Sequence, residues 1–546
     1  MIANGTRGLL ALGRYEALRA MALAAVPAAL LILLTPTGGD AAAHLYRTLL
    51  VREGVYVWDN LWFAGQYPLA SYSLLYYLPA AVVGNVPLVF CAVLASAALF
   101  ASISIREWGD AALWPARAFS LLAAGPLFTG TYSYALGLAS MLAALRALQA
   151  GRAWLGIALA ALTLGFSPLA FIFLCLVLLA VLVARRRVDV SLLAVGGGLG
   201  VLVATQVASF WLFPSEGEYP FRTFELVTVL TVSALGAFLA LRARGGNVLA
   251  ALFAVWGLAS LVVFVVPEPV GENLTRMRAF VFPVMLLTAL LARFRPRALA
   301  IAALAAALAY NVVPYAKAFP ERTSRPAGEE FWAPALAFLR SHATPDFRVE
   351  VVPTYDHWEA YWLPKAGFAL ARGWYRQLDI AQNAVLYRKP LSAQSYRAWL
   401  KRMGVKYVLL PETRLGKKGA DREAKLLRTR RLGLMEVFRS PDWLIFEVPR
   451  AEKILTGPAA ARLDVFGHRR IAGLATERGT YRLRVSYMPY WEVRRGRVCV
   501  SRALDGMTLL HAYRPGPFTL ALDQRPTDLV RSALGSRPDC RSAESK

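Results

Sequence analysis

Residues 21–34 read MALAAVPAALLILL, a run without a charged side chain. With its weakly polar flanks this run is long enough to span a membrane, because about 20 helical residues cross the hydrocarbon core. Arg7, Arg14 and Arg19 precede it, as in a signal peptide, but no small-residue cleavage site follows in Thr-Pro-Thr-Gly-Gly-Asp. We therefore expect an uncleaved signal-anchor helix that starts a multi-pass membrane protein.

Similar apolar runs continue to residue 315 and then thin out. Hydrophobic residues make up 57% of the chain, and the mean hydropathy is +0.44. The runs predict about eleven transmembrane helices in a domain covering residues 1–315. The expected spans are 17–36, 74–104, 112–127, 129–148, 153–167, 168–184, 189–213, 224–242, 247–267, 279–293 and 297–315.

Basic residues predict how these spans are oriented. If the N-terminus is cytoplasmic and the spans alternate, most of the arginines in short loops lie inside, among them Arg185-Arg186-Arg187 and the group Arg293, Arg295 and Arg297, as the positive-inside rule predicts. The outer loops are then 37–73, 213–223 and 268–278, and the C-terminal domain lies outside the plasma membrane. The net charge of +26 is explained in this way without nucleic acid, because the remaining basic residues form no dense block.

The sequence after residue 315 predicts a soluble exterior part with two domains. Residues 316–455 contain an amphipathic helix (FWAPALAFLRSH), a strand (DFRVEVVP) and a helix–glycine–strand unit (SYRAWLKRMGVKYVLLPE), which is an α/β pattern. Residues 456–546 alternate apolar and polar positions between turns, which predicts a small β-sandwich. Cys499 and Cys540 could pair there in an oxidising compartment, but Cys540 lies in a polar tail, so pairing is the less favoured expectation.

The loop after the first span holds the first candidate site. On a helix from Asp40 to Leu50, the side chains of Asp40, His44 and Arg47 share one face. That face could carry a catalytic base with its partner, or Asp40 and His44 as two ligands of a divalent metal. The alternative is that Gly-Gly-Asp simply caps the helix.

Aromatic residues follow in the same loop. An aromatic belt at the membrane interface accounts for most of them, and a sugar-binding surface would use the same residue types. Arg47, Asp59 and Tyr67 are the candidates for substrate binding in this loop. The residues concerned are Trp58, Asp59, Trp62, Tyr67, Tyr72, Tyr76 and Tyr77.

A second candidate lies in the outer loop that reads PEPVGENLTRMR. Asn273, Arg276 and Arg278 stand at a membrane edge where arginine runs against the charge bias. Arginine binds phosphate through paired hydrogen bonds, so these residues could hold a lipid phosphate. The alternative is an interfacial arginine whose side chain snorkels. A further polar group, Asp356, His357 and Glu359, is expected to be a satisfied cluster rather than a ligand surface.

The layout resembles the GT-C superfamily of membrane glycosyltransferases. It also resembles a group of bacterial multi-pass membrane proteins labelled as 6-pyruvoyl-tetrahydropterin-synthase-related. The stretches that carry the resemblance are GGDAAAHLYR, FAGQYPLASYSLLYYLP, FSPLAFIFL, PVGENLTRMR, ARGWYRQLD, YRAWLKRMGVKYVLLP and VSYMPYWEV.

The GT-C resemblance implies a polyprenyl-phosphate-linked sugar as donor and a membrane lipid environment. It implies that Asp40 acts as a base or metal ligand and that Arg276 or Arg278 binds the donor phosphate. Many members carry two acidic residues close together in the first outer loop, whereas three alanines follow Asp40 here.

Three functions follow as hypotheses. A glycosyltransferase would build a cell-envelope glycan, and a non-catalytic envelope scaffold could use the same frame. A transporter of lipid-linked glycans is less favoured, because Gln206 is the main polar residue within the spans.

Overall fold

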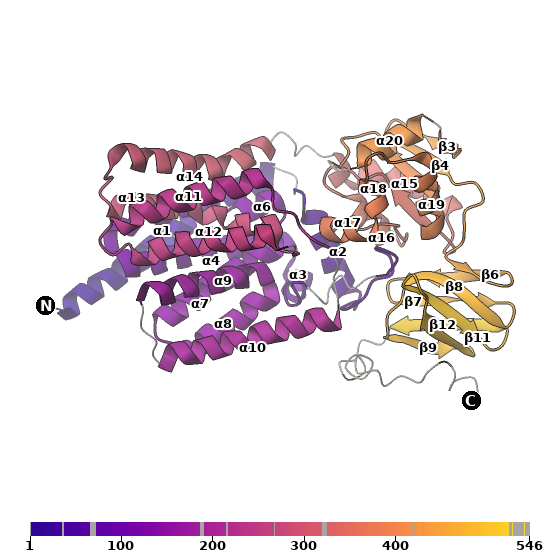
Figure 1. The fold of residues 1–546 in the computed structure, drawn as a ribbon, viewed down its shortest axis with the longest axis horizontal. Coiled ribbons are helices and arrows are strands. Elements are labelled where there is room, and N and C mark those ends of the chain that lie inside the picture. Colours follow the sequence, from indigo (N-terminus) through magenta and orange to yellow (C-terminus); the bar gives the residue numbers. More distant parts are fainter. Residues whose placement is uncertain are drawn as a thin grey trace. The chain divides into compact units, whose positions relative to one another are not determined.

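The computed structural model describes residues 2–34, 38–65, 72–185, 190–213, 217–266, 268–318, 325–416, 419–429 and 431–522, with Thr527 and Cys540. The chain forms two compact units, each described by itself (Figure 1). Unit 1 holds residues 1–44, 72–211 and 217–323. Unit 2 holds residues 45–71, 212–216 and 324–546, and the division falls within the helix α2 (Ala41–Arg52).

Unit 1 is helical, and the described residues of the predicted spans lie mostly in helices. The helices are α1 (Ile2–Leu34), α3 (Tyr77–Val83), α4 (Asn85–Trp108), η1 (Gly109–Ala112), α5 (Leu113–Leu122), α6 (Gly125–Thr129), α7 (Tyr132–Gln149), α8 (Ala153–Phe166), α9 (Pro168–Arg185), α10 (Val190–Leu212), α11 (Thr223–Leu241), α12 (Asn247–Val265), η2 (Gly271–Met277), α13 (Arg278–Leu291) and α14 (Arg297–Ala318).

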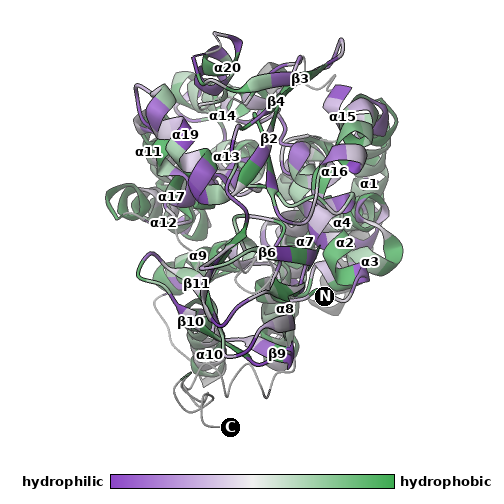
Figure 2. Cartoon of the chain, turned by 90° about the vertical axis from the view of Figure 1, so that its right-hand side faces the viewer, coloured by the Kyte–Doolittle hydropathy of each residue, from purple (hydrophilic) through white to green (hydrophobic). Residues whose placement is uncertain are grey.

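Among the described residues, eight helical stretches are long and apolar enough to cross a membrane. One of them, Asn85–Thr129, joins α4 to α6, and the apolar α8 has 14 residues, short of a full span. A multi-pass membrane protein is therefore confirmed, whereas the predicted count of eleven spans is not. Figure 2 shows the contrast in hydropathy between α10 or α12 and the more hydrophilic α19 and α20 of unit 2.

Contacts between helix ends in unit 1 fall into two groups. Arginines of the loops predicted to lie inside meet near one end, in the contacts Arg117–Glu16 (2.8 Å), Arg146–Ser102 (3.0 Å) and Arg185–Glu107 (3.6 Å). Loops predicted to lie outside meet at the other, through backbone bonds from Asp40 to Thr129 (3.2 Å), from Leu75 to Gly165 (2.8 Å) and from Tyr219 to Glu268 (3.1 Å).

The α/β part of unit 2 contains the predicted helix and strands. Its elements are η4 (Arg325–Ala327), α15 (Glu329–His342), β1 (Arg348–Val351), α16 (Glu359–Lys365), α17 (Arg376–Gln382), α18 (Ala384–Tyr387), α19 (Ala393–Met403), β2 (Val405–Pro411), α20 (Ala420–Arg428), β3 (Met435–Arg439) and β4 (Trp443–Glu447). The sheet order is β1-β2-β4-β3, with β1 and β2 parallel and the other pairs antiparallel. Gly404 ends α19 in the left-handed conformation, as the helix–glycine–strand pattern predicts.

The β part is two four-stranded sheets, ordered β10-β11-β8-β5 and β6-β7-β12-β9. Its strands are β5 (Leu455–Thr456), β6 (Ala461–Phe466), β7 (Arg470–Ala475), β8 (Gly479–Ser486), β9 (Trp491–Arg495), β10 (Val498–Arg502), β11 (Met507–Ala512) and β12 (Gly516–Leu522). A disulfide joins Cys499 to Cys540, so the expectation against pairing is wrong. Beside this disulfide, the hydroxyl of Tyr513 donates to the carbonyl of Cys540 at 2.5 Å.

Residues 45–65, which follow the first span, are part of the cores of unit 2. Trp58 and Leu61 are buried in the β core, and Ala64 is buried in the α/β core. The indole of Trp62 donates to the carbonyl of Ala360 at 3.0 Å. The aromatic-belt interpretation is therefore wrong for Trp58 and Trp62, because their hydrophobic contacts lie within the protein.

This packing also constrains the path of the chain. Segment 45–65 and the C-terminal residues 325–522 belong to one unit, so they lie on the same side of the membrane. The chain between them must then cross the membrane an even number of times.

Candidate functional site

The two main candidate loops meet in an ion pair in unit 1. Asp40 directly precedes α2, and Arg276 lies in η2. Nη2 of Arg276 is 3.0 Å from Oδ2 of Asp40, and the two side chains are 30% and 33% exposed. Sequence analysis predicts each residue for a site, and the structure brings the two together across 236 positions. The pair is a positive and a negative group that solvent or a ligand can reach.

The backbone of Asp40 is fixed against the end of α6. Its amide donates to the carbonyl of Thr129 at 3.2 Å. Gly130 makes this approach possible: its φ is +76°, and a Cβ there would stand 2.5 Å from the amide nitrogen of Ala41 and the carbonyl oxygen of Gly38. A side chain at position 130 would push the Asp40 loop away from its place.

The short helix η2 is fixed at its start by Glu268. The carboxylate accepts the amide of Val270 at 2.7 Å and also the amide of Gly271. Gly271 has a φ of +45°, and a Cβ there would collide with the carbonyl of Tyr219. These contacts hold the loop that carries Arg276 against the loop before α11.

Tyrosines surround Arg276. The hydroxyl of Tyr134 donates to the carbonyl of Arg276 at 3.2 Å. The ring hydroxyls of Tyr72 and Tyr219 are close enough to interact electrostatically with its guanidinium. Such surroundings can donate hydrogen bonds to a phosphate or to sugar hydroxyls. Only Tyr72 is noted in the sequence; Tyr134 and Tyr219 belong to other loops and helices, and no local pattern marks them.

Arg278 has different partners from Arg276 and is less exposed. Its guanidinium lies 3.4 Å from a carboxylate oxygen of Glu225 and 4.7 Å from the ring centroid of Tyr310. Arg222 pairs with Glu272 at 2.6 Å and with Glu225 at 3.3 Å. Arg278 is 17% exposed, roughly half as much as Arg276. Asn273 lies one turn before Arg276 in η2 and is partly exposed.

His44 lies in unit 1 within a group of tyrosines. It is 7% exposed, and its Nδ1 is 2.8 Å from the hydroxyl of Tyr77. The rings of Tyr76, Tyr77 and Tyr132 have centroids within 5.9 Å of the imidazole. Asp40 and His44 therefore have different side-chain partners, Arg276 and Tyr77.

The donor groups do not fit a divalent-metal site. The carboxylate of Asp40 is already paired with a guanidinium, and a cation next to Arg276 would be repelled. Within the described ranges, no group of three or more His, Cys, Asp or Glu side chains could hold a metal ion. The prediction of a metal stays a prediction, and no chemical step below passes through one.

The remaining predicted residues belong to unit 2. Arg47 is fully buried and donates to the hydroxyl of Tyr375 at 2.9 Å. Asp59 is fully buried, and its carboxylate accepts the hydroxyl of Tyr46 at 2.7 Å. A ligand could reach these two only by replacing buried contacts. Tyr67 lies outside the described residues.

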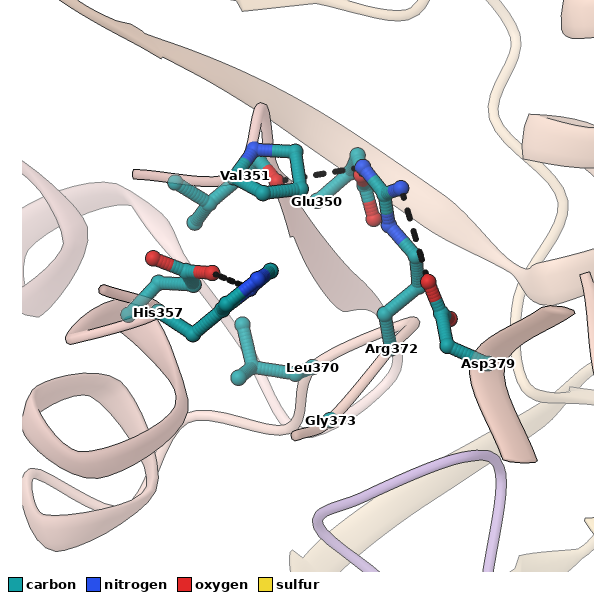
Figure 3. Close-up of a pocket in the computed structure, with 9 residues that line it drawn as sticks. Glu350, Val351, His357, Leu370, Arg372, Gly373 and Asp379 are labelled. Carbon is teal, nitrogen blue, oxygen red and sulfur yellow. Dashed lines mark hydrogen bonds and ion pairs between the residues drawn. The ribbon is translucent and has the colours of Figure 1, made fainter. Parts of the chain in front are cut away.

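The cluster around His357 lies in unit 2 beside a buried charge group (Figure 3). The carboxylate of Glu359 accepts the hydroxyl of Thr354 at 2.7 Å and contacts Nδ1 of His357 at 3.0 Å. The imidazole stacks on Trp374, with ring centroids 3.6 Å apart. The polar groups are paired, as the satisfied-cluster interpretation expects.

Next to it, Arg372 lies among three carboxylates. It pairs with Glu350, with Glu423 at 3.0 Å and with Asp379 at 3.9 Å. All four side chains are buried, and burial raises the pKa of Glu350 and Glu423. One guanidinium thus contacts three acidic groups, an arrangement that links β1, α17 and α20. Sequence analysis misses it because the four residues are scattered over 74 positions of chain.

The sequence and the structure were compared with known proteins. No protein-family model matches the sequence, and no curated protein matches it. Among solved structures, the arabinofuranosyltransferase AftD from mycobacteria is similar at 16% identity with a TM-score of 0.47. The match covers 79% of this chain and 40% of that one, so this chain spans well under half the length of the neighbour.

Proposed function

We propose that this protein is a membrane glycosyltransferase of the GT-C type. It would move a sugar from a polyprenyl-phosphate carrier to a cell-envelope acceptor at the outer membrane face. The observation that supports this most is the Asp40–Arg276 pair, which places a candidate base beside a candidate phosphate ligand on a partly exposed surface. The two loops also hold the positions, Asp40 and Arg276, at which the resemblance to the GT-C layout implies a base and a phosphate ligand.

The reaction follows from the chemistry of these two groups. Asp40 accepts the proton of an acceptor hydroxyl, whose oxygen attacks the anomeric carbon of the sugar. The bond from that carbon to the phosphate oxygen breaks, and the polyprenyl phosphate leaves with the electron pair. Arg276 stabilises the charge that develops on the leaving phosphate. The hydroxyls of the surrounding tyrosines would bind the sugar.

The proposed orientation puts this chemistry outside. The arginine-rich helix ends would face the cytoplasm, as the positive-inside rule requires. The Asp40 loop and unit 2 would then face the exterior, where the Cys499–Cys540 disulfide is chemically stable.

A scaffold that binds no donor is the alternative. Two observations favour it. Only one acidic residue, Asp40, stands at the start of the first loop, and Asp59 is fully buried, so its carboxylate could act as a second catalytic acid or base only if the side chain moved.

Binding of a polyprenyl-phosphate sugar to the purified protein tests the proposal. Arg276→Ala should lose binding at least tenfold, because a charge-assisted contact to phosphate is lost. Arg278→Ala should lose less, since Glu225 already compensates its charge. Arg293→Ala, in a loop predicted to lie inside, is the control. Folded wild-type protein that binds none of several such lipids would favour the scaffold.

A further inference from the structure

We propose that Asp40 and the donor phosphate compete for Arg276, so that the carboxylate becomes free to act as a base only once the donor is bound. This inference rests on the proposed function and assigns an order to its steps. The carboxylate that contacts Arg276 occupies the position that an anionic phosphodiester would take.

Charge balance is the first argument. Three arginines at this edge of unit 1, Arg222, Arg276 and Arg278, face three carboxylates, those of Asp40, Glu225 and Glu272. The ion pairs leave no surplus positive charge among these six groups. A phosphodiester with one negative charge is therefore accommodated best by exchange, with one carboxylate leaving its arginine as the phosphate arrives.

Exposure decides which carboxylate leaves. The side chain of Asp40 is 33% exposed, whereas those of Glu225 and Glu272 are 13% and 16% exposed. Glu225 contacts two arginines and Glu272 binds Arg222 through both oxygens, but Asp40 has one contact with its arginine. A single, partly exposed ion pair contributes little stability and is readily exchanged.

The backbone supports such an exchange. The amide of Asp40 is bonded to Thr129, and the carbonyl of Arg276 accepts the hydroxyl of Tyr134. Both main chains are thus held while the two side chains meet only at their tips. Separation of the pair needs a rotation of side chains and no movement of α2 or η2.

The order of events follows. Without donor, the carboxylate is occupied by Arg276 and is a poor acceptor for a hydroxyl proton. With donor bound, Arg276 holds the phosphate, and Asp40 is released next to the anomeric carbon. The base is thereby made available only when a sugar is present to receive the attacking oxygen.

The test measures binding of a short-chain polyprenyl phosphate esterified with methanol, a phosphodiester with one negative charge. Asp40→Asn removes the competitor and should bind this probe about two- to fivefold more tightly, the size expected for a partly exposed ion pair. Glu225→Gln is the matched control, because it also removes one carboxylate of this group but faces Arg222 and the less exposed Arg278, so any gain in affinity should be smaller than that of Asp40→Asn. Arg276→Ala combined with Asp40→Asn should lose the gain.

The outcomes separate the two proposals. Tighter binding by Asp40→Asn alone, with sugar transfer abolished, supports the competition. Wild-type binding that Asp40→Asn leaves unchanged or weakens overturns the competition and leaves the proposed function standing. An equal gain in Glu225→Gln also overturns it, since general electrostatics would then suffice. If no folded variant binds the probe or a sugar-bearing donor, the proposed function fails together with it.

Discussion

Nδ1 of His468 lies 2.8 Å from Oδ1 of Asp59, although 409 positions separate the two residues. Nε2 of the same imidazole is 3.1 Å from Glu53, and the hydroxyl of Tyr46 is 3.3 Å from Nδ1. Next to them, the amide of Asn60 donates to the carbonyl of His468 at 2.9 Å. This group fastens segment 45–65 to the β part of unit 2.

The stability of unit 2 should depend on pH through this histidine. Burial disfavours the charged imidazole, but the hydrogen bond to Asp59 and the charges of Asp59 and Glu53 outweigh burial and raise the pKa of His468. The charged ring therefore stabilises the folded state at low pH, and this contribution is lost as pH rises through the folded pKa. His468→Gln should lower the Tm more at about pH 6 than at about pH 9. An equal loss at both pH values would contradict this.

The buried group around Arg372 should be sensitive to loss of its only cation. Arg372→Met leaves Glu350, Glu423 and Asp379 without their counter-charge, and breaking such a buried pair costs about 3–5 kcal/mol. Thermal unfolding in detergent should show a large loss in Tm. Arg439→Ala, which removes an exposed arginine paired with Glu436, should leave Tm unchanged. A similar effect of both substitutions would contradict the assigned role.

The Cys499–Cys540 disulfide can be detected by peptide mass spectrometry with and without reductant. Protein purified without reductant should give a linked peptide containing Cys499 and Cys540, and thiol reagents should label these residues only after reduction. Cys91 and Cys175, which are free thiols, serve as internal controls for labelling in the unfolded protein. Free thiols at Cys499 and Cys540 in protein taken from intact cells would contradict exterior placement of unit 2.

The proposed orientation can be tested by cysteine labelling. With Cys91 and Cys175 replaced by serine, Leu504→Cys lies on a fully exposed turn of unit 2. An impermeant maleimide should label it in intact cells. Arg244→Cys, in a loop predicted to lie inside, should react only after permeabilisation. The reverse pattern would invert the protein and move the candidate site to the cytoplasm.

Periodicity and composition predict the elements of this fold well. Apolar runs predict the helices of unit 1 but not the number of spans, and the alternation after residue 456 predicts the two sheets of the β part, because both signals are local. The sequence of each loop also predicts Asp40 and Arg276 as site residues. Their contact cannot be predicted from the sequence, because it depends on how α6, η2 and α7 pack. For the same reason the burial of Trp58 and Trp62 could not be distinguished from an interfacial belt.

The insertion of Trp58 and Leu61 into the β core has a consequence for synthesis on the ribosome. This segment emerges early, but its packing partners, from Ile454 to Leu522, are made almost 400 residues later. Until the β part has been synthesised, the aromatic side chains of this segment therefore stay exposed to solvent, where a chaperone could bind them. A fragment that starts at residue 324 would have a hole where Trp58 belongs and should aggregate, so any shortened version of the exterior unit needs residues 45–65 supplied alongside.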